Sequence, residues 1–225
     1  MNPNTLIFLI SACIVCIGFY YLFFSRSAVV KSKIKSTPQK KICDVNEGEI
    51  VSIVGRIVLA GRVLTAPLSK RKGAYFSIKV RRGHDDHTFF SDYTKFDDEK
   101  SGDLLIYDGQ HYALIDSKLI VAHLNQDENY RYEPWNIDII NFPFRSSPEL
   151  GKYLEKHGKP KNMYSEMLID VYSSEGVLEE GEVVAIAGKA SWKKSSDFKL
   201  RIPNQQILYL QSLNEYGVYV TEDLF

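Results

Sequence analysis

The sequence predicts a mainly β, α+β protein in which one N-terminal transmembrane helix precedes a compact β-barrel or β-sandwich-like domain. Three observations predict this class: an uncharged apolar run near the N-terminus, strand-like segments from Glu49 onward, and a ten-residue motif that occurs twice. The chain has 225 residues, of which 44% are hydrophobic, enough for one packed domain and an anchor. We expect an anchor at 1–25, a basic juxtamembrane linker at 26–43 and the β-rich domain at 44–225.

The first element is the segment TLIFLISACIVCIGFYYLFF, Thr5–Phe24, which contains no charged residue. A helix of this length spans about 30 Å, the thickness of the hydrocarbon core of a bilayer. A cleaved signal peptide normally has a basic start and a shorter apolar stretch, and both are missing here. The tetrapeptide Ile10–Cys13 resembles a lipoprotein cleavage box, but the apolar run continues well beyond Cys13. The segment therefore predicts a single-pass transmembrane helix.

A basic cluster follows the apolar run, and the first 43 residues contain no acidic residue. Its members are Arg26, Lys31, Lys33, Lys35, Lys40 and Lys41. By the positive-inside rule, the N-terminus lies outside and the C-terminal domain faces the cytoplasm. We expect a bacterial inner membrane, or an organelle outer membrane in a eukaryote. The five lysines are also candidate contacts to anionic headgroups of the bilayer, each contributing about 1 kcal/mol, although a topology signal alone explains them equally well.

Strand patterns dominate the predicted domain. The run EIVSIVGRIVL at Glu49–Leu59 is apolar on both faces, as expected for a strand buried on both sides. Tyr75–Val80 alternates between two faces, and Asp103–Asp116 has an Asp-Gly turn between two strand-like runs, which predicts a hairpin. We therefore expect β-units near 47–125 and 164–212.

One amphipathic helix is predicted near 147–158. A serine precedes Pro148, and Glu149 lies at the positive end of the helix dipole. An apolar stripe with helical spacing follows at Leu150, Tyr153 and Leu154. The stripe predicts that the helix packs against a sheet.

The repeated motif reads EGEIVSIVGR at Glu47–Arg56 and EGEVVAIAGK at Glu180–Lys189. Six of the ten positions are identical, and the offset is 133 residues. Each copy consists of a polar turn that leads into a buried strand ending at a glycine. The motif predicts two related β-units packed in one domain.

In their order along the chain, EGEIVSIVGRI, TAPLSKRKGAYFSIKV, LLIYDGQHYALID and SEGVLEEGEVVAIAGKA resemble the GIDE family, also called beside-a-membrane (BAM) domains. The resemblance covers about residues 44–212. It implies a β-domain beside a membrane, like the membrane-anchored domain of MULAN-type ubiquitin ligases. Because members of that kind are RING-type ubiquitin transferases, the resemblance also implies ubiquitin transfer as an activity. Gly73 and Ala74 depart from the pattern, because the family often has a cysteine near them.

Catalytic chemistry is not predicted for this chain. The ligases of the family carry a C-terminal RING with cysteine and histidine zinc ligands, and no cysteine follows Cys43 here. The sequence also has no glycine-rich phosphate loop and no nucleophile elbow. The motif HDDH at His84–His87 resembles a metal cluster, but it lies in a polar stretch, 81–102, which we interpret as an insertion or a long hairpin loop. We expect no catalytic residue, no metal and no cofactor.

Two short segments are candidate binding surfaces. Tyr130, Arg131 and Tyr132 are predicted to form an exposed patch that could stack on a ligand or peptide. The basic turn of Lys70, Arg71 and Lys72 is predicted to be a solvated turn, with contact to headgroups or an acidic partner as the alternative. Beyond residue 43 the chain has 22 cations and 28 anions, a formal charge of −6, which disfavours a nucleic-acid binder.

These observations lead to three hypotheses about function. The first is a non-catalytic, cytoplasm-facing module that binds a protein partner or senses the membrane. The alternative is a ubiquitin-ligase-like protein that relies on a separate catalytic partner. The second alternative is a β-barrel that binds a small ligand or a nucleic acid.

Overall fold

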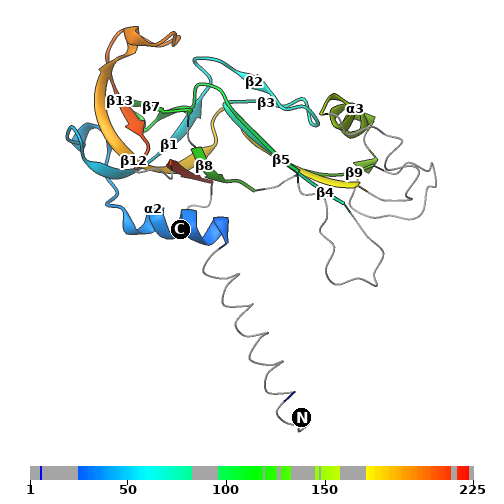
Figure 1. The fold of residues 1–225 in the computed structure, drawn as a ribbon. Helices are drawn as coiled ribbons and strands as arrows, with labels where there is room; N and C mark the ends of the chain where they lie inside the picture. Colours follow the sequence, from blue (N-terminus) through cyan, green and yellow to red (C-terminus); the bar gives the residue numbers. More distant parts are fainter. Residues whose placement is uncertain are drawn as a thin grey trace.

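The computed structural model describes residues 6, 25–82, 96–118, 120–125, 128–132, 145–146, 148–157, 171–213 and 217–222. Within these ranges the protein is mainly β, with a barrel and a second sheet beside it (Figure 1). Among the described residues, no helix combines the length and the apolar character needed to cross a membrane. Apart from Leu6, the predicted transmembrane segment Thr5–Phe24 lies outside these ranges and stays a prediction.

Five strands close into a barrel in the ring order β1–β6–β7–β13–β12, and β12 pairs back with β1. Their bounds are β1 Ile50–Val58, β6 Leu105–Tyr107, β7 Tyr112–Ile115, β12 Val183–Lys194 and β13 Gln206–Gln211. The β7–β13 pair is parallel and the other four pairs are antiparallel. In chain order the ring reads 1-2-3-5-4, the strand order of the OB-fold.

Apolar side chains fill the barrel. Ile53, Ile106 and Ile186 are at most 1% exposed and belong to one large buried cluster. Members of this cluster are two or four residues apart along each strand, because alternate side chains of a strand point to the same face. The ring therefore encloses a packed core.

A short extension and two helical turns flank the barrel. Strand β14, Val218–Thr221, pairs with β12, and β8, Ile120–His123, pairs in parallel with β14. Helix α2, Arg26–Ser36, packs on the outer face of β8, β12 and β14 (Figure 1). The 3-10 turns η1 and η2 cover Ile42–Asp44 and Ser195–Asp197. Segment 26–43, predicted as a linker, therefore contains a helix docked on the domain.

The second sheet has the order β10–β9–β11–β4–β5. Its strands are β4 Tyr75–Arg82, β5 Phe96–Ser101, β9 Glu128–Tyr132, β10 Arg145–Ser146 and β11 Val171–Leu178. Helix α3, Pro148–Lys156, packs on one face, and the short pair β2, Leu64–Thr65, and β3, Lys72–Gly73, carries the basic turn to the same face. The sheet is built from the two long connections of the barrel, β1 to β6 and β7 to β12.

The two copies of the repeated motif pair with each other. Strands β1 and β12 are antiparallel, and Ile53 lies opposite Ile186, its equivalent 133 residues later. The flanking hydrogen bonds repeat in the same way, because Gly48 donates to Ala190 O at 2.8 Å and Gly181 donates to Ile57 O at 2.9 Å. The two motifs are therefore related by a local pseudo-two-fold axis in the wall of the barrel.

The described elements test several of the sequence predictions. The mainly β class, the Asp-Gly hairpin β6–β7 and the helix at Pro148–Lys156 are confirmed. The antiparallel pairing of β4 with β5 agrees with the interpretation of 81–102 as a hairpin, but the segment is not a loop at its ends, because β4 continues to Arg82 and Phe96–Ser101 forms the edge strand β5. Its run of charged side chains hid the strand, and such charges suit a sheet edge because they oppose pairing with another chain.

Candidate functional site

The candidate site is the region where α2 meets the barrel. Ser25 caps the helix by accepting a hydrogen bond from Ala28 N at 3.2 Å. Val30 and Ile34, one helical turn apart, are 0% and 3% exposed and pack with Ala187 and Tyr219. The helix is therefore fixed on the barrel by a small apolar core of its own.

Polar contacts fix the N-terminal end of α2. The Arg26 guanidinium makes a two-pronged ion pair with the Glu99 carboxylate of β5, one prong being the 2.9 Å Nη2–Oε2 hydrogen bond. Tyr75 donates to the same carboxylate at 2.8 Å, and Ser27 Oγ lies 2.9 Å from His123 Nε2. The hydrogen bond to Glu99 raises the pKa of Arg26, and burial raises the pKa of Tyr75, so the two groups stay charged and neutral respectively.

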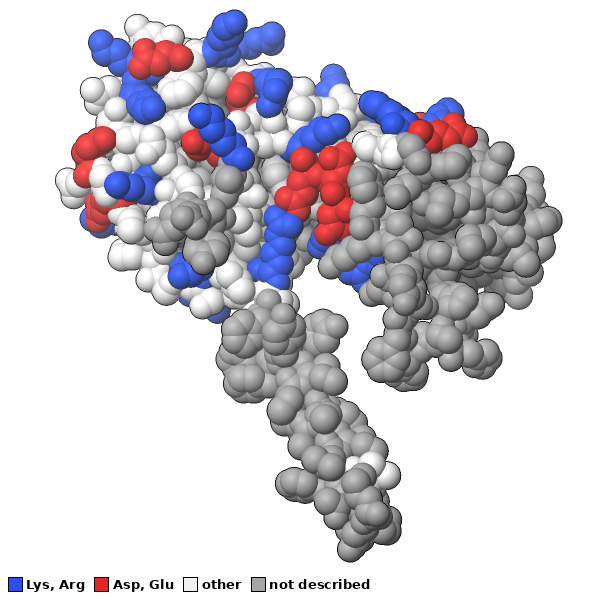
Figure 2. Space-filling view, viewed as in Figure 1, with Lys and Arg blue, Asp and Glu red and all other residues white. Residues whose placement is uncertain are grey.

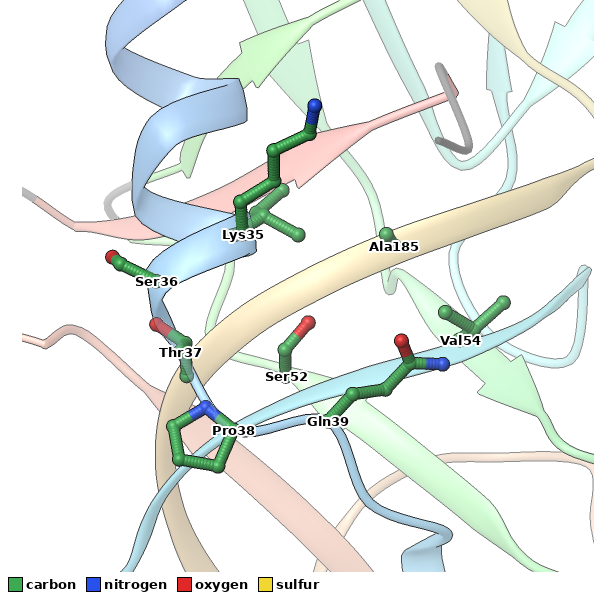
Figure 3. A pocket seen from close by; sticks show the side chains of 9 residues that line it. Lys35, Ser36, Thr37, Pro38, Gln39, Ser52, Val54 and Ala185 are labelled. Atoms are coloured by element: carbon green, nitrogen blue, oxygen red, sulfur yellow. The ribbon is translucent and has the colours of Figure 1, made fainter.

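A groove of about 790 Å³ lies beside the C-terminal end of α2 (Figure 3). The helix end and the turn after it form one side, and β1 and β12 form the other. Its lining residues are Ile34, Lys35, Ser36, Thr37, Pro38, Gln39, Ser52, Val54 and Ala185. The turn is tied to β1, because Ser52 N donates to Pro38 O at 2.9 Å and Lys40 N donates to Ser52 O at 3.0 Å.

The lysines predicted to contact the membrane surface divide into three groups. Lys31 and Lys35 lie one turn apart on one flank of α2, and the exposed Lys33 lies on the other flank. Lys40 forms an ion pair with Glu49 at 2.5 Å, and this pair lowers the pKa of Glu49. Lys41 is exposed before η1. Lys40 therefore has a structural partner, and the other four lysines lie on α2 or just after its end.

The basic turn is held by a buried carboxylate. Glu175 of β11 is 0% exposed and accepts hydrogen bonds from Leu68 N at 3.0 Å and Ser69 N at 2.8 Å. Ala66 N donates to Arg71 O at 2.8 Å and closes the turn. Sequence reasoning missed Glu175, although a single acidic residue within an otherwise uncharged strand run, SSEGVL, is a signal that could have found it.

The three cations of this turn have different surroundings. Lys70 has a φ of 65° and forms an ion pair with Glu149 of α3 at 3.0 Å. Arg71 forms an ion pair with Glu179 at 3.2 Å, and Lys72 is exposed. The turn is therefore a structural corner of the second sheet, in which Lys70 and Lys72 are exposed, as predicted for a solvated turn, while Lys70 and Arg71 also form ion pairs.

The prediction of an exposed patch at Tyr130, Arg131 and Tyr132 is wrong for Tyr130. This residue is 6% exposed and packs in the cluster beneath α3, because β9 lies inside the sheet between β10 and β11. Arg131 and Tyr132 continue the same strand, with backbones paired to Tyr172 and Val171. The motif His84–His87 lies outside the described residues, and the described part of the chain holds no group of three or more side chains suited to a metal ion.

Charges of both signs are intermixed over the face of the molecule shown in Figure 2. On this face the acidic and basic side chains lie side by side, and no single broad basic surface forms. Nucleic-acid binding normally requires such a surface.

Comparisons with protein-family profiles, curated proteins and solved structures found no match to this chain. The resemblance to GIDE domains therefore stays a prediction.

Proposed function

We propose that this protein is a membrane-tethered, non-catalytic binding module that holds its groove beside α2 at the cytoplasmic surface and takes a protein partner there. The observation that carries the proposal is the docking of α2. The helix begins two residues after the uncharged run Thr5–Phe24, and its first residue, Arg26, is clamped to Glu99. An anchor joined in this way sets the orientation of the domain on the membrane.

The groove supports binding of a protein segment. It has an apolar wall from Ile34, Val54 and Ala185, and polar groups from the turn at Thr37 and Gln39. Its volume of about 790 Å³ lies within the range typical of binding clefts. Such a mixture suits an apolar side chain and the backbone of an extended partner, and it offers no nucleophile–base pair.

A site-specific crosslinking experiment tests this proposal. A photoreactive residue at Gln39, which is exposed in the groove, is expected to capture a defined protein in intact membranes. The same residue at Ser196, exposed on η2, serves as the control position. Adding Val54→Arg, which fills the groove with a charged side chain, should abolish the Gln39 product. Equal products from both positions, or none from Gln39, would contradict the proposal.

A separate experiment tests the ubiquitin-ligase-like alternative. In this alternative the chain supplies substrate binding, while a separate RING protein supplies transfer. A transfer assay with purified components should show no stimulation by this chain if it is a binding module only. Stimulation that depends on the groove would instead favour the alternative.

One observation favours the ligand-binding alternative, namely the OB-like strand order of the barrel. Barrels of this kind bind oligonucleotides and oligosaccharides, but fold alone does not fix function. Titration with single-stranded DNA at low salt tests it, because electrostatic binding is strongest there. Saturable binding would revive this alternative against the protein-binding proposal.

A further inference from the structure

A second pocket lies far from the α2 groove, between α3, the basic turn and strands β4 and β5. Its volume is about 330 Å³, at the lower end of the range for small-molecule sites. The basic residues that line it are Lys70, Lys100, Lys152, Lys156 and His157. Phe76 and Tyr153 form an aromatic floor, with 4% and 6% of their surfaces exposed.

The floor is held in place by Asp98 of β5. Tyr153 donates to Asp98 Oδ2 at 2.6 Å, and His157 Nε2 lies 3.8 Å from the same oxygen. His157 Nδ1 is 2.9 Å from the Tyr153 carbonyl, and the two rings pack at 4.3 Å. These contacts fix the orientation of Tyr153 and His157 without using the lysines that surround them.

The lysines that line the pocket outnumber the carboxylates near them. Glu149 lines the pocket and pairs with Lys70 at 3.0 Å and Lys152 at 3.3 Å. Asp98 lies 3.8 Å from Lys100, a loose contact, and Lys156 has no ionic partner among the described residues. Four lysines thus line the pocket with one carboxylate, Glu149, while the carboxylates of Asp98 and Glu175 act on Tyr153 from behind the floor. The lysines outnumber these three carboxylates, so an anionic ligand would complete the balance.

The pocket opens on the side of the second sheet opposite α2. Asp98 and Glu99 are neighbours on β5, so their side chains point to opposite faces. Asp98 contacts α3, whereas Glu99 contacts Arg26 of α2. In the orientation proposed above, headgroups of the anchoring bilayer lie on the Glu99 side. The ligand of the α3 pocket would therefore come from solution.

We propose that the α3 pocket binds a small soluble organic phosphate, with the phosphate between Lys100, Lys152 and Lys156 and an apolar or aromatic body on Phe76 and Tyr153. Lysines bind phosphate as point charges, and a phosphate monoester supplies close to two negative charges at neutral pH. Aromatic floors favour a flat body, which distinguishes an organic phosphate from inorganic phosphate.

Calorimetric titration of the full chain in phosphatidylcholine nanodiscs, with phenyl phosphate as probe, tests the proposal. Saturable binding that weakens with added salt is expected, and inorganic phosphate should bind more weakly because it lacks the ring. Lys156→Glu should weaken phenyl phosphate binding at least about tenfold, because it reverses one charge at the phosphate position. The matched control is Lys72→Glu, which makes the same charge change at an exposed lysine outside the pocket.

In phosphatidylcholine nanodiscs, three outcomes would overturn the proposal. They are the absence of saturable binding at low salt, an equal loss in the Lys72→Glu and Lys156→Glu proteins, and equal affinity for phosphate and phenyl phosphate. The source of the ligand is tested in nanodiscs that contain phosphatidic acid, whose headgroup is also a phosphate monoester. Competition by this lipid would assign the pocket to a headgroup and contradict a soluble ligand.

Discussion

At the scale of single residues, the most consequential side chain is Glu175. It is fully buried, and its two oxygens accept hydrogen bonds from the backbone of the basic turn at Leu68 and Ser69. A buried carboxylate is costly unless its hydrogen bonds are made. Here they fix a turn that also contains Lys70 in the left-handed region, at a φ of 65°.

We predict that Glu175→Ala lowers the free energy of unfolding by about 2–4 kcal/mol, because it leaves two N–H groups near Leu68 without acceptors. Glu175→Gln should lose less, because its amide oxygen still accepts one hydrogen bond. Glu180→Ala, at an exposed position five residues later, is the control and should change little. Urea unfolding measures all three, and a loss as small as that of the control would refute this role for Glu175.

A pH effect is expected at Asp108, in the β6–β7 turn. Burial favours its neutral form, but hydrogen bonds from the backbone N–H groups of His111, Gln110 and Ile42 outweigh it and lower the pKa of Asp108. A depressed pKa stabilises the folded state above the unfolded value of 3.8, and this contribution is lost as the pH falls through the folded pKa. The wild type should therefore be more stable than Asp108→Asn at pH 7, and the difference should shrink below pH 3.8. A pH-independent difference would exclude this linkage.

At the scale of elements, α2 is the part whose position bears most on function. Val30 and Ile34 are the two buried residues of this helix, and they provide its apolar contacts with the barrel. The docked surface is therefore small and sensitive to mutation. The ion pair of Arg26 with Glu99 joins the same helix to the second sheet. The helix thus bridges the barrel extension and β5.

We predict that Val30→Ala destabilises the domain by about 1–2 kcal/mol, because two buried methyl groups are lost and alanine recovers part of the cost through its better helix propensity. The neighbouring Val29 is 36% exposed and provides the matched control. Val29→Ala should leave stability unchanged or slightly raised. Hydrogen exchange at the backbone of α2 measures the docking directly, and equal protection in the two variants would contradict it.

The sequence predicted some elements well and missed others for identifiable reasons. The Asp-Gly signal and the Leu150–Leu154 stripe are local patterns, so the hairpin and α3 were predictable. Helix α2 was missed because its charged composition hides a buried pair, Val30 and Ile34, that only packing reveals. Tyr130 was misjudged because the pairing of β9 between β10 and β11 depends on distant residues. The α3 pocket likewise combines lysines from three separate segments.

At the scale of the whole molecule, the barrel is organised by the pairing of its two repeated motifs. Gly55 and Gly188 are equivalent in the repeat, and each faces a carbonyl of the next strand in the ring. A Cβ at Gly55 would lie 2.9 Å from Tyr107 O, and one at Gly188 would lie 3.0 Å from Gln211 O. Neighbouring backbone approaches closely at both positions, so a side chain at Gly55 would force a shift and one at Gly188 would leave a tight contact. The recurrence of glycine in both copies of the motif agrees with this close approach.

We predict that Gly55→Ala and Gly188→Ala each destabilise the protein by about 1–3 kcal/mol, because the added methyl group pushes adjacent strands apart. The two losses should be similar, since the sites are related by the pseudo-two-fold. Lys189→Ala, at the exposed position beside Gly188, controls for a change on β12. Thermal unfolding provides the comparison, and two glycine variants as stable as the control would argue against the close approach.

The pairing of β1 with β12 also has a consequence for how the protein is made. Strand β1 ends at Val58, but the strands that close the ring with it, β12 and β13, end at Lys194 and Gln211. A ribosome adds residues from the N-terminus, so β1 can pair with β6 early, but its other edge stays unpaired until β12 is made, more than half of the chain later. Pairings this distant in sequence form slowly, and an unpaired apolar strand is prone to join other chains. The nascent protein therefore needs shielding during synthesis, and a chain that stops before β13 cannot complete its barrel.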